Sequence, residues 1–408
     1  MKSNRMFQLF ALVMVAVFVL ASCAPAATQA PAAQSSSSSS SSSSQSFDWS
    51  KATSAADGGG MDALVAAAQK EGNLTVITLP RNWCDYGDMM DSFTAKYGIK
   101  IQDVNPDGGS ADEVQAIKDN MQNAGPQAPD VLDIGAAYGP LAAGQNDPND
   151  PKLLSAYKVT TWDTIKGNND PDGLYYVDYY GVMSFEINTD ALNGASVPQT
   201  WSDLLKPEYK SMIGLPGDPR ASNEAAQSVY AAAINNGGTL DNIQPGLDFM
   251  KQLASSGNLL PLIADGGVIA KGETPVSIHW SFNALADKAN FNGNPNIQVV
   301  YPTGTAWGGY YYQAISAYAP HPAAARLWEE YLYSDEGQTI LAKGFCIPAR
   351  FADLTSRSVL SQDIVNALPS PDMFNSAVIP SIDQLSTARA AIKDQWDSVV
   401  GLDIKSGS

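Results

Sequence analysis

The apolar segment Leu74-Thr-Val-Ile-Thr-Leu79 has the length and the β-branched content of a buried strand, and it follows a segment with helical periodicity, Met61 to Lys70. The alternation continues with a helix at Met89 to Tyr97, a strand at Ile99 to Val104, a helix at Val114 to Met121 and a short strand at Val131 to Ile134. Strands that alternate with helices predict an open α/β sheet.

The second half of the chain has the same alternation. Strands are expected at Tyr179 to Ile187, Ile213 to Leu215, Pro275 to His279 and Ile297 to Tyr301, and helices from Pro198, at Asn223 to Ile234, Leu247 to Ser255 and Ala323 to Tyr333. Thr200 or Ser202 is the expected cap of the helix that follows Pro198. With 408 residues, the chain is long enough for two domains that each have a core.

The formal charge is −18, and it becomes −20 if the leader that contains Lys2 and Arg5 is removed. An acidic surface repels phosphate backbones, so nucleic acid is excluded as a partner. The charge favours solubility and attracts cations, and solubility alone is a sufficient reason for it.

The N-terminus has the pattern of a secretory signal: Lys2 and Arg5 precede an apolar run from Met6 to Leu20. Leu20-Ala-Ser-Cys23 resembles the bacterial lipobox, in which the cysteine is lipid-modified and becomes the first residue. We therefore predict a signal peptide over residues 1–22 and lipidation of Cys23. The alternative is an ordinary signal peptide in which Cys23 has no role.

Residues 23–60 are predicted to be a flexible tether, because they are rich in Ala and Pro and contain an unbroken serine tract from Ser35 to Ser44. The folded region is expected to begin near Met61. Without Cys23, the cysteines left are Cys84 and Cys346, an even number in an oxidising compartment. We predict that they form a disulfide; the alternative is two distant free thiols.

Common catalytic motifs are absent: the sequence has no phosphate-binding loop, no G-x-S-x-G elbow and no H-E-x-x-H. Its two histidines, His279 and His321, suit a structural role and a surface turn respectively. Aromatic residues gather near Trp83, Tyr175 to Tyr180, Trp280 and Trp307 to Tyr312. Such rings either line a small-molecule pocket, where they also attract cations, or pack the core.

Four segments carry a resemblance to a known family. They are Asn82-Trp-Cys-Asp-Tyr86 with the helix after it; Trp201 to Lys210 with Gly217-Asp-Pro-Arg220; Gly272-Glu273 with Val276 to Asn283; and Tyr310 to Pro320 with Ala323 to Gln338. From about Glu71 to its end, the chain resembles type II periplasmic solute-binding proteins, close to the spermidine/putrescine-binding and ferric-binding group.

The resemblance implies an α/β fold with two lobes, a ligand cleft between them and closure about a hinge. It places residues 61–181 and 312–336 in the first lobe and residues 182–311 and 337–403 in the second. It implies no catalytic activity, no cofactor and no metal. It also places the two cysteine segments near the cleft, in support of the disulfide.

The ligand contacts implied by the resemblance come from both lobes. They are Trp83, Asp85, Tyr138, Asp218, Arg220, Trp280, Tyr311 and Gln313. Rings and carboxylates in such a set are suited to an ammonium group. However, Gln313 and Ala221 stand where the polyamine binders have acidic residues, and the adjacent tyrosines of the ferric binders are missing at His279 to Phe282.

We therefore expect an extracytoplasmic, membrane-anchored and monomeric receptor of an ABC transporter, which passes a small solute to a permease. The expected ligand is a cationic or zwitterionic organic compound of polyamine-like character. The alternatives are an anionic or phosphorylated solute and ferric ion, and more remotely the protein is a secreted carbohydrate-active hydrolase.

Overall fold

The computed structural model describes residues 47–406 except positions 107, 124 and 148. The predicted signal peptide, the lipidation site Cys23 and the serine tract lie outside the described residues. Within the described part, no helix has both the length and the apolar character that a membrane crossing requires.

Residues 47–60 were expected to belong to the tether, and this expectation is wrong. They form two short 3-10 helices, η1 (Trp49–Lys51) and η2 (Ala55–Gly58). The Trp49 side chain is buried, and the Arg326 guanidinium donates hydrogen bonds to the carbonyls of Ser50 and Ala52 at 3.1 and 3.0 Å. The folded region therefore includes Phe47 to Gly60. The buried indole of Trp49 and the hydrogen bonds from Arg326 hold this segment against the first lobe, which its composition did not indicate.

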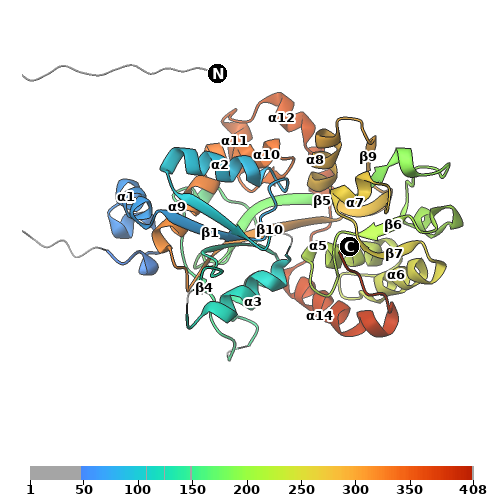
Figure 1. The fold of residues 1–408 in the computed structure, drawn as a ribbon, viewed down its shortest axis with the longest axis horizontal. Helices are drawn as coiled ribbons and strands as arrows, with labels where there is room; N and C mark the ends of the chain where they lie inside the picture. Colours follow the sequence, from blue (N-terminus) through green and yellow to red (C-terminus); the bar gives the residue numbers. More distant parts are fainter. Residues whose placement is uncertain (1–46, 107, 124, 148, 407–408) are drawn as a thin grey trace, which may run out of the picture. The chain divides into compact units, whose positions relative to one another are not determined.

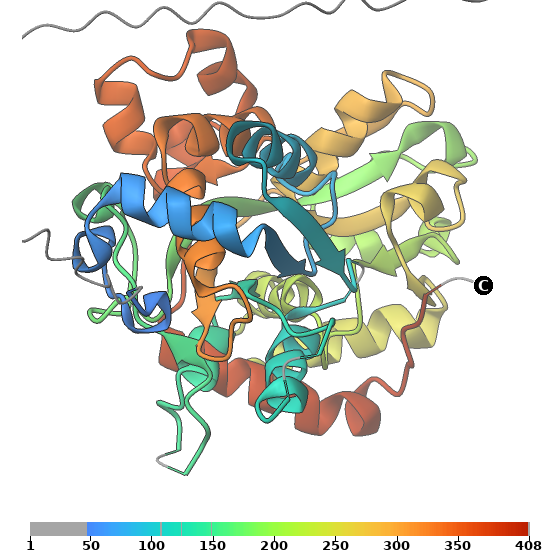
Figure 2. The ribbon, with the colours of Figure 1, turned by 60° about the vertical axis from the view of Figure 1, so that its left-hand side comes forward.

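The first lobe begins with the predicted alternation. The strands β1 (Asn73–Ile77) and β2 (Lys100–Val104) are parallel, and the helices are α1 (Met61–Glu71), α2 (Tyr86–Tyr97), α3 (Ser110–Asn120) and α4 (Tyr138–Ala142). Figure 2 shows α1 beside α9 (Pro322–Leu332), and the two helices are in contact. β1 and β2 form a separate two-stranded sheet, whereas β3 (Val131–Gly135) belongs to a larger one.

The larger sheet has nine strands, and β5 (Tyr176–Asn188) is shared by its two halves. The first part of β5, up to Val182, pairs with β10 (Gly308–Ser316). From Met183 onward, β5 pairs with β8 (Val276–Trp280) and, from Phe185, with β9 (Ile297–Val300). In Figure 1, β5 and β10 run between the two groups of helices and strands, which are the two lobes.

The remaining strands complete the two halves. They are β4 (Leu154–Ser155), β6 (Ile213–Leu215), β7 (Leu259–Ile263) and β11 (Ile347–Pro348). The order is β3-β10-β5-β8-β6-β7, with β4 on β10 and with β9 and β11 on β5. The second-lobe strands β6, β7 and β8 are parallel to one another.

Two helices of the second lobe, α5 (Asn223–Asn235) and α6 (Gln244–Ser256), were predicted, whereas α7 (Gly266–Ala270) and α8 (Ser281–Phe291) were not. The helix expected from Pro198 is only a 3-10 turn, η5 (Trp201–Leu205), but Thr200 caps it as expected, by accepting a hydrogen bond from the Asp203 amide at 3.2 Å. The other 3-10 turns are η3 (Trp162–Thr164), η4 (Thr189–Ala191) and η6 (Pro207–Tyr209).

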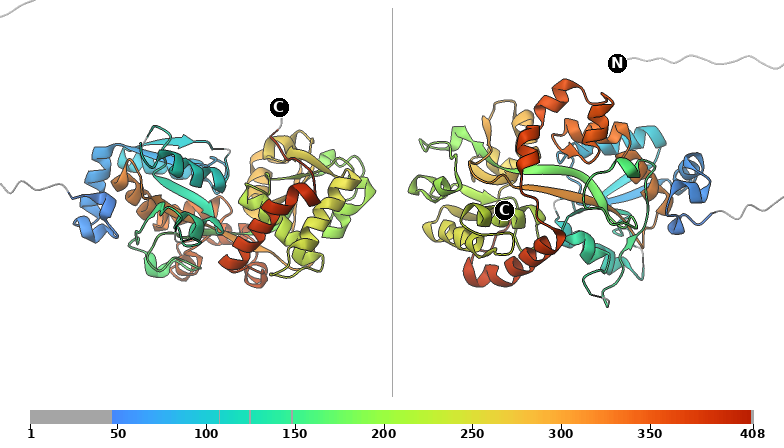
Figure 3. Two further views of the ribbon diagram at one scale, coloured as in Figure 1. Left: turned by 90° about the horizontal axis from the view of Figure 1, so that it is seen from below. Right: turned by 180° about the vertical axis from the view of Figure 1, so that it is seen from behind.

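The C-terminal helices divide between the lobes. They are α10 (Asp335–Lys343), α11 (Phe351–Ser356), α12 (Gln362–Ala367), α13 (Pro371–Ser376) and α14 (Ile382–Val399). α10 contacts α2 and α9, whereas α14 contacts α5 and α6, and Figure 3 shows it in dark red beside the second lobe. For the lobes, we propose to keep the boundary between residues 181 and 182, which lies within β5. We assign residues 337–348 to the first lobe, because β11 pairs with Tyr179 and Tyr180.

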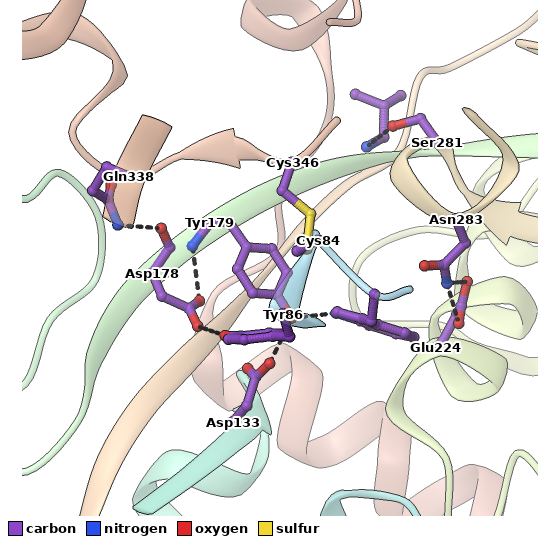
Figure 4. The surroundings of a disulfide bond; sticks show 12 residues. Cys84, Tyr86, Asp133, Asp178, Tyr179, Glu224, Ser281, Asn283, Gln338 and Cys346 are labelled. Carbon is purple, nitrogen blue, oxygen red and sulfur yellow. Dashed lines mark hydrogen bonds between the residues drawn. A yellow bond between two sulfur atoms is a disulfide. The ribbon is translucent and has the colours of Figure 1, made fainter. Parts of the chain in front are cut away.

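A disulfide joins Cys84 and Cys346, as expected, with their Cα atoms 5.4 Å apart (Figure 4). It ties the loop before α2 to the segment between α10 and β11. Cys84 and Asp85 both have a positive φ, of 47° and 61°, and a Cβ on Gly344 would lie 2.3 Å from the Cys84 carbonyl carbon. The disulfide loop is thus held in one close-packed conformation.

Replacing Trp49 with alanine tests the N-terminal boundary of the fold. Because this indole is 7% exposed, Trp49→Ala should lower the free energy of unfolding by about 3 kcal/mol in urea titrations. The matched control Phe47→Ala removes a ring that is 42% exposed and should change stability little. If Trp49→Ala were as stable as the unaltered protein, residues 47–60 would not contribute to the folded region and would belong to the tether.

Removing both sulfur atoms tests the disulfide. The double variant Cys84→Ala/Cys346→Ala should lose about 2–5 kcal/mol of unfolding free energy, since the cross-link restricts the unfolded chain. In the unreduced protein unfolded in urea, alkylation followed by mass measurement should modify neither Cys84 nor Cys346. Modification of both would show that the disulfide does not form.

Candidate functional site

Five aromatic side chains from the two lobes meet where β5 and β10 cross between the lobes. We call this set the aromatic cluster: Trp83, Tyr179, Trp280, Phe282 and Tyr311. The ring centroid of Trp83 lies 5.2 Å from that of Phe282 and 5.5 Å from that of Tyr311. Tyr179 stacks on Tyr311 at 5.4 Å, and Trp280 stacks on Phe282 at 6.2 Å. The structure thus brings together three of the predicted contacts, Trp83, Trp280 and Tyr311.

Two glycines in the crossing strands make room for these rings. A Cβ on Gly181 of β5 would lie 2.5 Å from a ring carbon of Phe282, and a Cβ on Gly309 of β10 would lie 2.3 Å from a ring carbon of Trp280. Real Cβ contacts are not this short, so the indole and the phenyl ring lie directly over bare backbone. The lack of a side chain at Gly181 and Gly309 thus allows rings of the second lobe to pack against the crossing strands.

Trp83 is also connected to a buried carboxylate in the first lobe through Tyr179, and Figure 4 labels Tyr179 and Asp133. Its indole N–H donates to the Tyr179 hydroxyl at 2.6 Å, and that hydroxyl donates to Asp133 Oδ2 at 2.9 Å. Burial raises the pKa of Asp133 to about 7, although the hydrogen bond from Tyr179 lowers it. The other oxygen, Oδ1, has no partner among the described residues.

Gln313, a predicted ligand residue, belongs to this network and not to the aromatic cluster. It is fully buried, and its amide nitrogen donates to the Tyr86 hydroxyl at 2.9 Å and to Asp178 Oδ2 at 3.2 Å. Burial, reinforced by Asp133, raises the pKa of Asp178 well above its usual range. The side-chain amide of Gln313 thus forms hydrogen bonds within the core of the first lobe.

On the second lobe, Glu224 lies beside Trp280. Its Oε1 accepts from the Trp280 backbone N–H at 2.7 Å, and it forms an ion pair with His279 Nδ1 at 3.2 Å. Burial alone lowers the pKa of His279, but the attraction of Glu224 and then Glu186 outweighs it and raises the pKa to about 10. His279 has the structural role that its sequence context indicated, as a buried cation that balances Glu224.

Tyr138 connects the lobes at a second place, outside the aromatic cluster. Its hydroxyl donates to the carbonyl of Ala221, just before α5, at 2.9 Å. The guanidinium carbon of Arg389, on α14, lies 4.0 Å from the centroid of the Tyr138 ring. Both polar and ring contacts of Tyr138 are thus made with the second lobe, and we call this arrangement the interlobe contact.

Asp218 and Arg220 form an ion pair with each other. The guanidinium Nε and NH2 groups donate to both carboxylate oxygens of Asp218 at 2.6–3.0 Å, and Arg220 also binds Asp397 and Asp403 at 2.7 Å. Asp218 is 24% and Arg220 25% exposed, so both side chains lie mainly within this surface network. No contact among the described residues joins either of them to the aromatic cluster.

Asp85 also lies apart from the aromatic cluster. It is half-buried at the start of α2, and burial and then Asp88 raise its pKa, while Lys343 lowers it. Its electrostatic neighbours therefore belong to α2 and α10.

Tyr179, Phe282, Asp133 and Asn223 are the residues of this region that sequence reasoning missed. Tyr179 and Phe282 belong to segments that the sequence analysis had identified as rich in aromatic residues. The sequence did not show which of these side chains point toward the junction of the lobes.

Two hollows lie elsewhere on the described surface. One, of about 560 Å³, is lined mainly by β1, β2 and the segments around Pro126 and His321. The other, of about 280 Å³, lies between Val182 and Met183 of β5, the segment from Tyr301 to Trp307, Trp201 and Met373. Neither is lined by Trp83, Trp280 or Tyr311, so both hollows are distinct from the aromatic cluster.

Known proteins resemble this chain in both sequence and fold. The chain is 25% identical to the spermidine/putrescine-binding periplasmic protein of Escherichia coli (strain K12) over 328 residues, which cover 78% of this chain and 88% of that protein. The periplasmic binding protein AfuA from Actinobacillus pleuropneumoniae, with fructose-6-phosphate bound, superimposes with a TM-score of 0.63 at 21% identity, covering 81% of this chain and 99% of AfuA.

Iron-bound HitA from Pseudomonas aeruginosa has a TM-score of 0.57 at 17% identity, over 80% of this chain and 98% of HitA. These structural likenesses establish the periplasmic binding-protein fold. In addition, residues 146–377, more than half of the chain, match the family model described as bacterial extracellular solute-binding protein. The chain therefore belongs to the bacterial extracellular solute-binding proteins.

Proposed function

We propose that this protein captures a small organic solute at the aromatic cluster, closes its lobes on it and delivers it to the permease of an ABC transporter. The observation that carries the proposal is the origin of the rings: Trp83 comes from the first lobe, Trp280 and Phe282 from the second, and Tyr179 and Tyr311 from the strands between. A solute held among these rings contacts both lobes at once. Its binding is thereby coupled to the angle between the lobes.

The proposed ligand is a small polar compound with few positive charges. A polyamine with several ammonium groups needs a carboxylate for each, because a desolvated charge without a partner is strongly unfavourable. Asp218 is already paired with Arg220, and Gln313 is neutral. Asp133, with a free oxygen behind Tyr179, is the acid best placed to receive a single amine or hydroxyl.

The location that we propose is the outer face of the cytoplasmic membrane or the periplasm. A lipid on Cys23 would anchor the protein, and the serine-rich segment would allow the lobes to reach a permease. We further propose that the receptor acts as a monomer.

The alternative classes find less support. Ferric ion requires converging phenolates, but Tyr310 and Tyr312 are engaged with Asn168. Among the described residues, no cluster of three His, Cys, Asp or Glu has the arrangement of a metal site. A glycoside hydrolase requires two carboxylates that flank an open groove. Asp133 and Asp178, the acids that accept hydrogen bonds from Tyr179, are 5% and 0% exposed.

A thermal-shift screen of amines, amino acids, organic acids and sugar phosphates tests the proposal, since a ligand at 100 times its dissociation constant adds about 2.7 kcal/mol of stability. For any compound that binds, Trp83→Ala should weaken the affinity at least about tenfold in calorimetry. The control Trp162→Ala removes an indole that packs on Tyr176 and should leave the affinity within about twofold. Equal affinities for Trp83→Ala and the unaltered protein would place the ligand elsewhere.

The interlobe contact makes a separate prediction. Tyr138→Phe removes one hydrogen bond of 2.9 Å between the lobes, a contribution of about 0.5–1.5 kcal/mol to the closed state. The affinity should therefore fall about two- to tenfold. Stopped-flow measurements should locate this loss in the dissociation rate, and an unchanged dissociation rate would contradict a role of Tyr138 in closure.

A further inference from the structure

Two buried hydrogen-bond donors of the second lobe have no partner among the described residues: Asn223 Nδ2 and Trp280 Nε1. Asn223 is 6% and Trp280 1% exposed, so water has little access to either side chain. Both lie near the Tyr311 hydroxyl, whose pKa is raised by burial and then by Glu224, and lowered by these two neighbours. Neither meets that hydroxyl in hydrogen-bond geometry. Buried donors are normally paired, and an unpaired pair at one place indicates a missing acceptor.

The same place is the N-terminus of a helix. Asn223 is the first residue of α5, which has 13 residues and therefore a partial positive charge at this end. The Ser222 hydroxyl accepts from the Ala225 amide, so the cap occupies one of the four N–H groups that have no partner within the helix. The helix terminus and the two side chains thus provide hydrogen-bond donors at one place.

The nearby carboxylate of Glu224 adds negative charge at this position, as its effect on the pKa of Tyr311 shows, but its oxygens are engaged by groups of its own lobe. Its Oε1 lies 3.2 Å from Nδ1 of His279, whose pKa is raised to about 10 by Glu224 and then Glu186 despite its burial. Its oxygens also accept hydrogen bonds from the Trp280 amide at 2.7 Å and from Asn283 Nδ2 at 3.2 and 3.3 Å. Glu224 is therefore fully engaged with groups of its own lobe, and it fixes the backbone of Trp280.

The first lobe covers this place when the lobes are together. A Cβ on Gly135, at the end of β3, would lie 2.1 Å from Cγ of Asn223, so only glycine allows the approach. A Cβ on Gly109 would lie 3.4 Å from the Ala221 carbonyl oxygen, which places the start of α3 over the segment before α5. A group bound at Asn223 would thus be enclosed by both lobes, next to the aromatic cluster.

We propose that the ligand carries an oxyanion, a carboxylate or a phosphate, which Asn223 Nδ2, Trp280 Nε1 and the N-terminus of α5 bind. This assignment rests on the proposed receptor function and deepens it, because it names the chemical group that the second lobe recognises. The remainder of the ligand would extend toward Trp83 and Asp133. The resulting ligand class is an organic acid or phosphate ester that also bears a hydroxyl or an amine.

Compounds matched in length and differing in charge test the assignment: 1,4-diaminobutane, 4-aminobutanoate and succinate, together with fructose 6-phosphate and fructose. Calorimetry should detect binding for at least one oxyanion compound and none for 1,4-diaminobutane or fructose. A preference for succinate or 4-aminobutanoate would identify a carboxylate, and a preference for fructose 6-phosphate would identify a phosphate.

The variant Asn223→Asp places a negative charge where the oxyanion is expected, and it should weaken binding at least about 100-fold. The control Asn366→Asp makes the same change at an exposed position on α12 and should leave the affinity within about twofold. Binding of 1,4-diaminobutane alone would overturn the oxyanion and leave the receptor function standing. Equal affinities for Asn223→Asp and the unaltered protein would also overturn it, and a series in which no compound binds would count against both proposals.

Discussion

Strand β5 is the element on which the rest of the structure depends, because its hydrogen bonds hold both lobes. Up to Val182 it pairs with β10, and from Met183 it pairs with β8. One continuous strand therefore belongs to two half-sheets, and the lobes meet where its partner changes. Gly181 lies next to this change and gives the rings of Phe282 and Trp280 their place over the backbone.

The first lobe adds a rigid element to this arrangement. The disulfide between Cys84 and Cys346 holds the loop that bears Trp83, and the Trp83 indole binds the Tyr179 hydroxyl on β5. A side chain that the disulfide positions thus contacts rings of the opposite lobe. On the second lobe, the ion pair of Glu224 and His279 holds the backbone of Trp280 in the same way. Each lobe thus contributes an indole, Trp83 or Trp280, whose backbone is held in place by a cross-link or by hydrogen bonds.

Sequence periodicity predicted most strands and the helices α1, α2, α3, α5, α6 and α9, because periodic burial is a local property of the chain; it did not predict α4, α7, α8 or the helices from α10 to α14. It also singled out the ring-rich segments that contain Trp83, Trp280 and Tyr311. It failed at Trp49, whose segment η1 contacts α9, a helix distant in sequence. It also could not place Gln313. Gln313 and Tyr311 are two apart on β10 and pair with Asp133 and Gly135 of β3, yet the first binds Tyr86 and Asp178 while the second reaches Tyr179.

The choice of ligand residues shows the limit of resemblance most clearly. Asp218 has the residue type that an amine would need, but Arg220 two residues later binds it from the same turn. Asn223 was not singled out at all, because an asparagine at a helix start is common and its lack of a partner is visible only in three dimensions. A polar side chain that is paired within the protein, such as Asp218, thus has a structural role. A buried polar side chain without a partner among the described residues, such as Asn223, is a candidate for ligand contact.

Small-angle X-ray scattering during titration with a binding compound tests the central claim most directly, since the two lobes should approach each other as the aromatic cluster receives its ligand. The account predicts that the radius of gyration of the folded region falls as the site fills and that it saturates with the binding isotherm. A radius of gyration that stays constant while calorimetry reports a saturated site would contradict it.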